Sequence, residues 1–577
     1  MNRKQRRATI KHGSRAAGRP SDSDGSQIKK LFVDAVQLET AGKLNDAVRA
    51  YKRALLLKPD HAEACNNLGR VLQTLGKTTD ASIFYARALA LMPQLLQQYA
   101  GICATLFSLL PDLDRALRRQ AVAWPKKQTE AELFGDAGLA AIAADPLLLY
   151  LLQSTPVRDV AFERLLTSLR ASFLADVTAA RPISETVLGF ACALAKQCFI
   201  NEYVFATTPD EDAQVERLKH ALGASASRTQ LAVLAMYYPL HTLPSTSMLL
   251  GKSWTPAIDD LLTQQLREPA QERQLRDSIP QLTAIEDEVS QKVRQQYEEN
   301  PYPRWVHVAG QVTPMPIDQY LRDQFPGGVY APLGKIDALD MLIAGCGTGQ
   351  VAIASVQKYL GARALAIDLS LSSLCYASRK TPTDLTARID YAQADILKLA
   401  SIGRSFDVVD ACGVLHHMAD PLEGWRILLG LLRPGGLMHL AFYSDAGRND
   451  VAAARAFIAE RGYGSTPAEI RRCREDLLKT PLASVTRFND FFATSECRDL
   501  LFHVHETRVN IPIIKGFIAE HGLKFIGFEF DQPILQRSRA EFAAAGWSLA
   551  DLDRWHDIEM KYPDTFSSMY QFWVQKA

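Results

Sequence analysis

Long hydrophobic runs are scarce in this sequence of 577 residues. Apolar stretches such as 187–195 fall short of the roughly 18–20 residues that a membrane-spanning helix needs, so we expect none. Net charge is scarce as well: it is +1, with 22% charged and 47% hydrophobic residues. This balance is ordinary for a globular protein and excludes a global electrostatic field for nucleic acid.

Paired cysteines are also missing. The nine cysteines are scattered, and none forms the C-x-x-C spacing of a zinc site or a dithiol redox centre. We therefore predict reduced cysteines, a cytoplasmic location and no metal, since the histidines show no ligand spacing either.

The first 26 residues differ from the rest. Seven Lys or Arg residues precede the first acid, Asp22, and no apolar stretch follows that would make a secretory signal. Residues 1–26 are predicted to be a disordered basic tail. It is either simply solvated or an arm for RNA, the ribosome or an acidic protein, and it is the only part through which nucleic acid is expected to bind.

An internal repeat follows the tail. Residues 28–61 and 62–95 match when shifted by 34 positions, a pattern that resembles the tetratricopeptide repeat (TPR). The matched pairs are Leu38/Leu72, Gly42/Gly76, Ala47/Ala81, Tyr51/Tyr85, Ala54/Ala88 and Pro59/Pro93. With a degraded third unit at 97–127, this predicts a TPR region over 27–129 that offers a groove to a peptide or protein. The alternatives are dimerisation, which makes a homo-oligomer possible, and a purely structural cap.

Residues 130–296 carry apolar positions at three and four spacing throughout, which predicts a helical domain. No motif in it points to chemistry. The segment 201–203 lies among aromatic residues and is typical of helix packing.

A strand, a glycine loop and a helix are predicted over 339–360. The apolar run 339–344 ends in the loop 345–349, and helical periodicity follows from Val351. Glycines let the backbone approach a ligand closely at the carboxyl end of a first strand. This unit alone is compatible with binding of either a dinucleotide or a methyl donor. The residues of the neighbouring strands are needed to distinguish between the two ligands.

Two acids at the ends of the next two strands select the methyl donor. Asp368 ends strand 364–367, where a carboxylate can accept both ribose hydroxyls. Asp395-Ile396 ends strand 389–394, and here the chain resembles class I S-adenosylmethionine-dependent methyltransferases. In that family the acid accepts from the adenine amino group, while the apolar neighbour packs on the ring.

The remaining elements follow the same family order. Strand 406–412 leads into Gly413-Val414-Leu415-His416-His417-Met418. Helix 421–432, the sequence Arg433-Pro434-Gly435-Gly436 and strand 437–443 come next. Two later segments, 524–530 and 569–575, are suited to an antiparallel hairpin that closes the sheet. The resemblance implies a Rossmann-like α/β methyltransferase domain over 297–577. Its sheet would have seven strands with an antiparallel C-terminal hairpin, preceded by the all-α TPR and helical region.

The resemblance also implies the site residues. Those expected to bind S-adenosyl-L-methionine are Gly345, Cys346, Gly347, Thr348, Gly349, Asp368, Leu369, Asp395, Ile396 and Cys412. The candidates for a general base are His416, His417 and His503, because imidazole titrates near neutral pH. The alternative for the adjacent pair is plain loop packing.

Two segments are candidates for acceptor binding. An insertion at 445–510 in the family pattern predicts a substrate cover, and Tyr297-Glu298-Glu299-Asn300-Pro301-Tyr302-Pro303-Arg304-Trp305 lies just before the first strand. The candidate residues are Tyr297, Tyr302, Arg304, Trp305, Glu496, Arg498 and His505. The alternative for the insertion is a helix capped by Ser495, with Arg498 and the acids on a solvated face.

These observations predict a methyltransferase whose TPR region recruits a protein substrate. A small-molecule or RNA methyltransferase that uses its repeats for assembly is the second hypothesis. A non-catalytic scaffold is the third, and the intact glycines, Asp368 and Asp395 argue against it.

Overall fold

The computed structural model describes residues 22–221, 226–244, 246–308, 312–530 and 532–577. Residues 1–21, most of the predicted tail, lie outside the described residues. The described residues form two compact units: those up to residue 111 with 145–147, and those of 112–144 with 148–577. No helix in the described ranges is both long enough and apolar enough to cross a bilayer.

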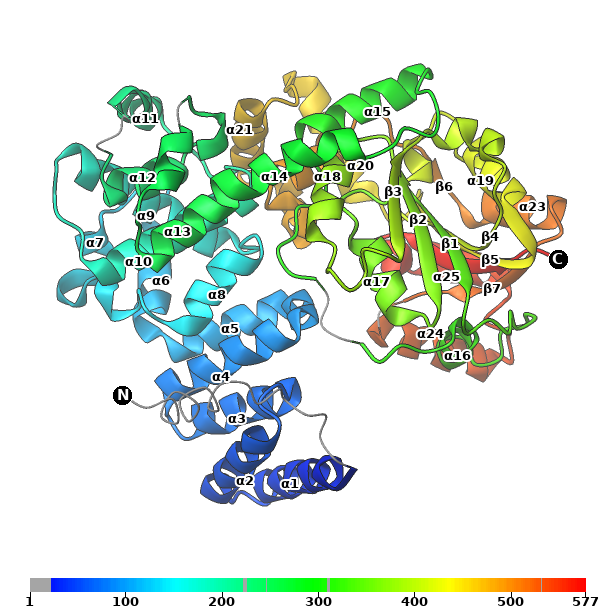
Figure 1. Ribbon diagram of the computed structural model, residues 1–577, viewed down its shortest axis with the longest axis horizontal. Helices are drawn as coiled ribbons and strands as arrows, with labels where there is room; N and C mark the ends of the chain where they lie inside the picture. The colour runs from blue at the N-terminus through cyan, green and yellow to red at the C-terminus, as the bar shows by residue number, and fades with distance from the viewer. Residues whose placement is uncertain (1–21, 222–225, 245, 309–311, 531) are drawn as a thin grey trace, which may run out of the picture. The chain divides into compact units, whose positions relative to one another are not determined.

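The first unit consists of paired helices, drawn in blue in Figure 1. They are α1 (Asp22–Thr40), α2 (Leu44–Leu57), α3 (Ala62–Thr74), α4 (Thr78–Leu91) and α5 (Tyr99–Leu109). The matched residues Ala47, Ala81 and Tyr51 are fully buried, because small side chains let neighbouring helices approach. Gly42 and Gly76 turn the chain with φ of 72° and 71°, a conformation that favours glycine. The 34-residue repeat is thus confirmed in equivalent structural positions.

The second unit begins with helices, as the 3.6-residue periodicity predicts. They are α6 (Pro111–Ala123), α7 (Glu130–Phe134), α8 (Pro146–Ser154), α9 (Val160–Thr178), α10 (Glu185–Ile200), α11 (Pro209–Ala221), α12 (Arg228–Ala235), α13 (Pro256–Leu262), α14 (Glu268–Leu275) and α15 (Glu288–Glu299). Asp159 and Ser184 cap α9 and α10 by accepting backbone N–H hydrogen bonds. The proposed boundaries of the TPR region and of the helical domain remain predictions.

A mixed sheet follows, with the strand order β3-β2-β1-β4-β5-β8-β7. Its strands are β1 (Leu339–Ala344), β2 (Ala362–Asp368), β3 (Ile389–Gln393), β4 (Phe406–Ala411), β5 (Leu432–Ser444), β6 (Arg508–Val509), β7 (Lys524–Phe528) and β8 (Tyr570–Gln575). Strands β7 and β8 pair antiparallel, and the two-residue β6 adds to the end of β5. The fold class is confirmed, and the chain reverses its strand order between β1 and β4, where such sheets bind ligands.

Helices cover both faces of this sheet (Figure 1). One face packs against α16 (Ile317–Gln324), α17 (Gln350–Lys358) and α18 (Leu371–Lys380). The other packs against α19 (Pro421–Gly430), α23 (Ile511–Glu520), α24 (Gln532–Ala545) and α25 (Leu552–Lys561). The ring of Trp425 stacks on Phe517 at 3.9 Å in that second layer. The rigid layers fix the carboxyl ends of the strands in space.

The predicted insertion is a helical element of its own. It contains α20 (Asn449–Arg461), α21 (Pro467–Leu477) and α22 (Thr494–Phe502). A buried ion pair of 2.8 Å joins Arg474 of α21 to Glu163 of α9, and Thr494 N–H donates to the carbonyl of Asn201. The insertion is therefore anchored to the helices at 130–296, which no sequence motif indicated.

Candidate functional site

Neighbouring protein atoms crowd the glycine loop. Gly345 and Gly347 adopt φ of 71° and 50°. A Cβ on Gly347 would lie 2.7 Å from the carbonyl oxygen of Tyr302, and one on Gly345 would lie 2.5 Å from Val414. Any larger residue at these two positions would therefore have to displace neighbouring backbone or side chain.

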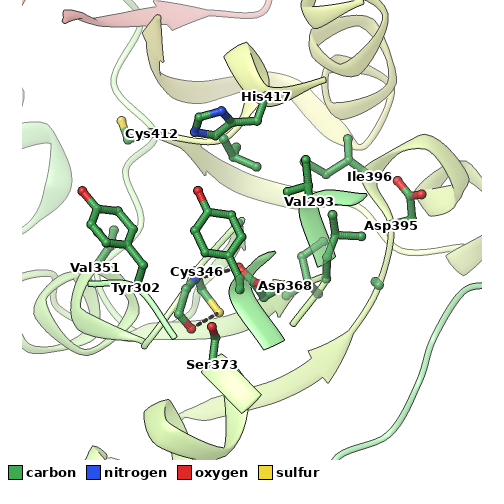
Figure 2. Close-up of a pocket in the computed structure, with 18 of the residues that line it drawn as sticks. Val293, Tyr302, Cys346, Val351, Asp368, Ser373, Asp395, Ile396, Cys412 and His417 are labelled. Atoms are coloured by element: carbon green, nitrogen blue, oxygen red, sulfur yellow. Dashed lines mark hydrogen bonds between the residues drawn. The ribbon is translucent and has the colours of Figure 1, made fainter. Parts of the chain in front are cut away.

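A cavity of about 200 Å³ opens beside this loop, lined by segments that follow β1, β2, β3 and β4. Figure 2 shows Asp368, Asp395, Cys412 and His417 around it. The predicted cofactor residues that line it are Gly345, Cys346, Gly347, Asp368, Leu369, Asp395, Ile396 and Cys412. Thr348 and Gly349 lie outside the lining. Thr348 is buried against Trp305, and Gly349 begins α17.

Asp368 holds the loop and faces the cavity. Its Oδ2 accepts from Gly347 N–H and its Oδ1 from Ser370 N–H, both at 2.8 Å. Burial raises the pKa of this carboxyl to about 6, although the two amide hydrogen bonds favour the charged form. Each oxygen keeps a second lone pair, which suits a diol such as a ribose.

Asp395 presents an unused acceptor. Its Oδ1 accepts from Leu397 N–H at 3.0 Å, whereas the buried Oδ2 has no hydrogen-bond partner in the described part of the chain. Burial raises the pKa of Asp395, and the Leu397 amide and the nearby Ser290 hydroxyl oppose this. A buried acceptor without a donor is costly, so Oδ2 is ready for an N–H group of a ligand.

Helix α15 forms a wall of the cavity that sequence reasoning missed. Ser290 and Val293 line it beside Tyr297. The chain reaches this place because residues 280–283 run along β3, with Leu282 N–H donating to Gln393 O at 2.8 Å. At the other end of the helix, Glu298 accepts from the Leu371 amide. Only the polar pattern of α15 with its single apolar stripe could have indicated such a role.

His417 lines the cavity with its tautomer set by the backbone. Its Nδ1 lies 3.1 Å from the carbonyl oxygen of His505, which only accepts, so Nδ1 carries the hydrogen. Nε2 then keeps its lone pair, 3.9 Å from Asp499 Oδ1, and burial lowers the pKa of the ring although Asp499 opposes this. His417 is thus a neutral acceptor at the cavity wall, as a general base has to be.

His503 stacks on His417 with ring centroids 3.6 Å apart. Its Nδ1 accepts from His505 N–H at 3.1 Å, so its proton lies on Nε2, which is 3.2 Å from Tyr297 OH. Tyr297 in turn donates to Asp499 at 2.5 Å. His417, Asp499 and His503 bring ligand-type atoms within 4.8 Å, but a metal would need the His503 proton on Nδ1, against the His505 amide. The cluster is built as a hydrogen-bond chain.

Several predicted residues lie away from the cavity lining. His416 is buried behind His417, with its ring 4.1 Å from Tyr443. His505 contributes its backbone to the two imidazoles, while its own Nε2 contacts Thr507. Arg304 pairs with Glu202 at 3.6 Å, and Trp305 donates to Thr348. Of the proline-flanked segment, Tyr297, Tyr302 and Pro303 reach the cavity.

Helix α22 corrects the alternative interpretation of the insertion. Its N-cap is Ala493 rather than Ser495, and all residues from 494 to 501 are buried. Arg498 pairs with Glu299 at 3.1 Å and donates to the carbonyl of Ser465. The solvated face was wrong because α15 and the loop before α21 cover these charged side chains.

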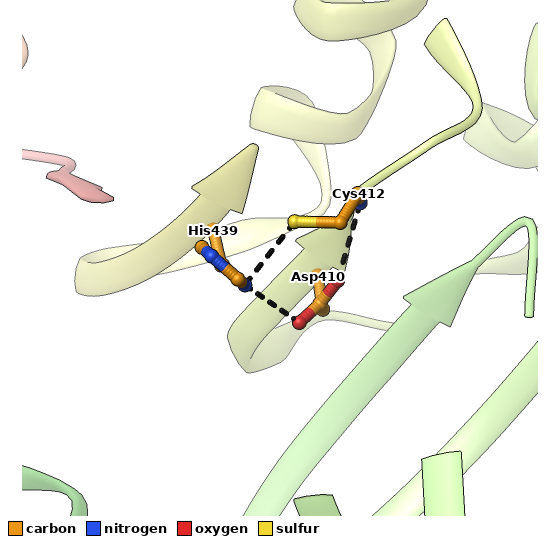
Figure 3. Close-up of side chains that lie close together, drawn as sticks. All are labelled: Asp410, Cys412 and His439. Atoms are coloured by element: carbon orange, nitrogen blue, oxygen red, sulfur yellow. Dashed lines mark hydrogen bonds and ion pairs between the residues drawn. The ribbon is translucent and has the colours of Figure 1, made fainter. Parts of the chain in front are cut away.

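A second polar cluster supports the cavity wall at Cys412 (Figure 3). His439 Nδ1 lies 2.9 Å from Asp410 Oδ2 and 3.2 Å from Cys412 Sγ. Burial, followed by Asp410, raises the pKa of the Cys412 thiol well above its usual value. In these surroundings Cys412 is a protonated thiol that lines the cavity wall and is a poor nucleophile.

Two stretches of the chain match family models. Residues 342–438 match the model described as a methyltransferase domain, and residues 41–76 match the model described as a TPR repeat. The first stretch runs from β1 into β5 and contains the glycine loop, Asp368, Asp395 and His417. The sheet with its terminal hairpin and the cavity at its switch point thus define a Rossmann-like transferase.

Similarity to a curated relative establishes the family of this chain. A ubiquinone biosynthesis O-methyltransferase of Paracidovorax citrulli is 30% identical over 186 residues, 32% of this chain and 74% of that protein. The chain belongs to the S-adenosylmethionine-dependent methyltransferases, and S-adenosyl-L-methionine is its cofactor.

Other relatives are matched over less of their length. An uncharacterised protein of Synechococcus sp. is 27% identical, with 42% of this chain and 61% of that protein covered. A ubiquinone biosynthesis O-methyltransferase of Cereibacter sphaeroides is 32% identical, with 25% and 55% covered. The chain thus spans less than two thirds of these two proteins. Among solved structures, PKMT2 from Rickettsia typhi in complex with AdoHcy is 15% identical, covering 45% of this chain and 53% of that chain, with a TM-score of 0.35.

Proposed function

We propose that this chain transfers a methyl group from S-adenosyl-L-methionine to a side chain of a protein that its TPR region recruits. The observation that carries the proposal is the neutral His417 imidazole at the wall of a cofactor-type cavity, whose Nε2 keeps its lone pair near Asp499. Free cysteines throughout the described residues support a reducing compartment, and we place the protein in the cytoplasm.

The cavity fits the cofactor on its own residues. Asp368 would hold the ribose hydroxyls, and the unpartnered Oδ2 of Asp395 would accept from the adenine amino group, with Ile396 against the ring. The bound cofactor supplies an electrophilic methyl group on a sulfonium. The Gly345 and Gly347 backbone leaves room for a ligand that any Cβ at these positions would reduce.

The chain's own contribution to catalysis is positioning and proton removal. His417 Nε2 is the acceptor for the proton of the incoming nucleophile, and the His505 carbonyl stabilises the imidazolium through Nδ1. Tyr297 and Tyr302 line the cavity next to the glycine loop. The hydrogen-bond chain from His503 through Tyr297 to Asp499 keeps these side chains in place.

The repeat match supports a protein acceptor. TPR helices present side chains to peptide and protein partners, and the first unit leaves apolar residues in solvent, with Leu56 80% and Val33 44% exposed. Such side chains lose water-exposed apolar area when a partner binds.

The test is transfer of a labelled methyl group from the cofactor into protein in an extract. Gly347→Arg places a long side chain against Tyr302, so we expect loss of AdoHcy binding and of label by more than about 100-fold. Gly516→Arg is the matched control, because a Cβ on that exposed glycine of α23 would have no neighbouring atom within 4 Å. Label that enters only RNA or small molecules would overturn the protein acceptor.

Small-molecule methylation is a second candidate, favoured by the two relatives named as ubiquinone biosynthesis O-methyltransferases. It predicts that label appears in a solvent-extracted fraction and not in protein. A scaffold without catalysis predicts AdoHcy binding without transfer to any fraction.

A further inference from the structure

Three carboxyl groups of the insertion, those of Asp490, Glu496 and Asp499, gather at the His417 end of the cavity. Glu496 and Asp499 are three residues apart and share one face of α22. That face meets Tyr297, which donates to Asp499 at 2.5 Å. Asp490 joins them just before α22, accepting from Tyr302 OH at 3.3 Å. Both tyrosines also line the cavity, so the acids stand directly behind its aromatic wall.

The side chain of Glu496 is buried without a full set of hydrogen-bond partners. Its side chain is 5% exposed, and Oε2 has no hydrogen-bond partner among the described residues. Burial raises its pKa to about 8, and the charge of Asp490 acts in the same direction. A buried carboxyl that keeps its proton near neutral pH marks a place where positive charge is missing.

The surrounding charges lead to the same conclusion. Arg158 faces Asp490 and Glu496, while Arg448 and Arg455 both pair with Glu506, and Arg304 pairs with Glu202. Among these described groups, five carboxyls thus stand against four guanidinium groups. If Glu496 were ionised, one further cation would be needed to balance these groups; without that cation, Glu496 keeps its proton. His417 and His503 do not supply the cation because burial lowers the pKa of both.

Aromatic rings face the same space. Tyr297 and Tyr302 lie 6.2 Å apart, and Tyr443 lies 6.5 Å from the His417 ring. The hydroxyls of Tyr297 and Tyr302 contact Asp499 and Asp490, while the two rings stack on each other and line the cavity. Tyrosine faces combined with carboxylates attract ammonium groups.

We propose that the methyl acceptor is a primary ammonium group, such as that of a lysine side chain, bound between the tyrosine rings and the carboxyls Asp490, Glu496 and Asp499. This assignment rests on the proposed function and specifies its acceptor. The ammonium loses one proton to His417 Nε2, and the nitrogen lone pair then forms the N–C bond to the methyl carbon. The electrons of the broken C–S bond pass to sulfur, which leaves neutral AdoHcy.

The same charges disfavour a phenol as acceptor. A phenol has to approach the phenolate to attack, and a site in which one carboxyl already stays protonated opposes a further negative charge. The acceptor chemistry inferred for this chain thus differs from the oxygen acceptor in the names of its relatives.

The first test is binding, which does not depend on turnover. Titration of n-butylammonium into the full chain saturated with AdoHcy should give saturable binding, while n-butanol of equal length should bind at least tenfold more weakly. Glu496→Gln should weaken n-butylammonium at least fivefold and leave the AdoHcy Kd within twofold. Glu520→Gln, at an exposed site on α23, is the control and should change neither. Asp490→Asn serves as a second variant should Glu496→Gln not fold.

Two outcomes would overturn the ammonium site. Equal binding of butanol and butylammonium would show that charge is not recognised. A parallel loss of AdoHcy binding in Glu496→Gln would assign the acids to the amino group of the cofactor instead.

The second test separates this inference from the proposed function. Labelled proteins are hydrolysed in acid, and we expect the label as N-methyllysine, lost when amines are acetylated before the reaction. Base-labile methyl ester or methylarginine would refute the ammonium acceptor while leaving protein methylation intact. Absence of label from protein would refute the proposed function itself, and the butylammonium titration would still decide the binding site.

Discussion

The TPR helices contain contacts between residues that are close in the sequence, whereas the cavity of the second unit depends on contacts between residues that are far apart in the sequence. In the repeats, Tyr51 donates to Glu39, 12 residues away, and Tyr85 bonds Gln73 at the same separation. In the site, Tyr297 donates to Asp499 across 202 residues. The first kind of structure can be recognised by sliding the sequence along itself, whereas the second needs the complete fold.

Electrostatics differ between the two regions as well. The ion pairs of the first helices, such as Arg49 with Asp46, are exposed and contribute little. Around the cavity, by contrast, buried groups such as Asp368, Glu496 and His503 have pKa values moved to about 6, 8 and 2. Shifts of this size are typical of functional sites, which agrees with the site proposed in the second unit.

The largest effect on the rate of methyl transfer is expected from a substitution of His417 in the cavity of the second unit. Asparagine keeps the donor to the His505 carbonyl but removes Nε2, so His417→Asn should lower kcat by about 100-fold to 10,000-fold. Because burial lowers the pKa of His417, the wild-type rate should fall with acid only below pH 6.5, and the variant should lose this limb. Kinetics of methyl transfer across pH measure both.

His521→Asn is the control for that substitution. Its Nδ1 also bonds a backbone carbonyl, that of Phe517, but at the C-terminal end of α23, outside the cavity lining. An equal loss of rate in the two variants would contradict a role for His417 as base.

An intermediate effect is expected from Asp368. Its pKa of about 6 is raised, and only the carboxylate accepts from both ribose hydroxyls. Protonation as the pH falls from 7 to 5 should therefore weaken AdoHcy binding about tenfold, with full affinity above pH 7. Calorimetric titration gives the Kd at each pH. Asp368→Asn should bind weakly throughout and without this slope; a slope that persists would place the titration elsewhere.

The smallest effect is expected in the repeats. Gly42→Ala forces a Cβ into a backbone with φ of 72°, which costs about 1 kcal/mol. Hydrogen exchange should then speed up roughly fivefold in α1 and α2, since 1 kcal/mol is a factor of about five in an opening equilibrium. Amides of the sheet should exchange unchanged, and AdoHcy should bind as before. Faster exchange in β1 or β4 would show that the regions open together.

The parts of the fold that could be predicted from the sequence are those in which neighbours along the chain carry the signal. Strand, glycine loop and acid follow one another within a few residues, so Gly347, Asp368 and Asp395 were found with their elements. Ser290 and Val293 were missed because their helix reaches the cavity through the pairing of 280–283 with β3. No spacing in the sequence indicates that pairing.

The solvated face expected for the charged residues of α22 was wrong for a related reason. Polar residues such as Glu496 and Arg498 normally indicate a solvated face, yet here every residue from 494 to 501 is buried. What buries them is α15 and the loop before α21, both remote in the sequence. These side chains can be buried because Arg498 donates hydrogen bonds to the Glu299 carboxylate and to the carbonyl of Ser465, and because Glu496 keeps its proton.

The pair Glu163–Arg474 has a consequence for shortened versions of this protein. Arg474 is 1% exposed, and Glu163 in α9 is its only carboxylate partner among the described ion pairs. A chain that starts at residue 297 would contain the whole family match but leave this guanidinium buried without a counterion, a change that typically costs about 3–5 kcal/mol. Expression of the methyltransferase half alone should therefore give a misfolded insertion, and fragments intended for crystals or assays should begin before α9.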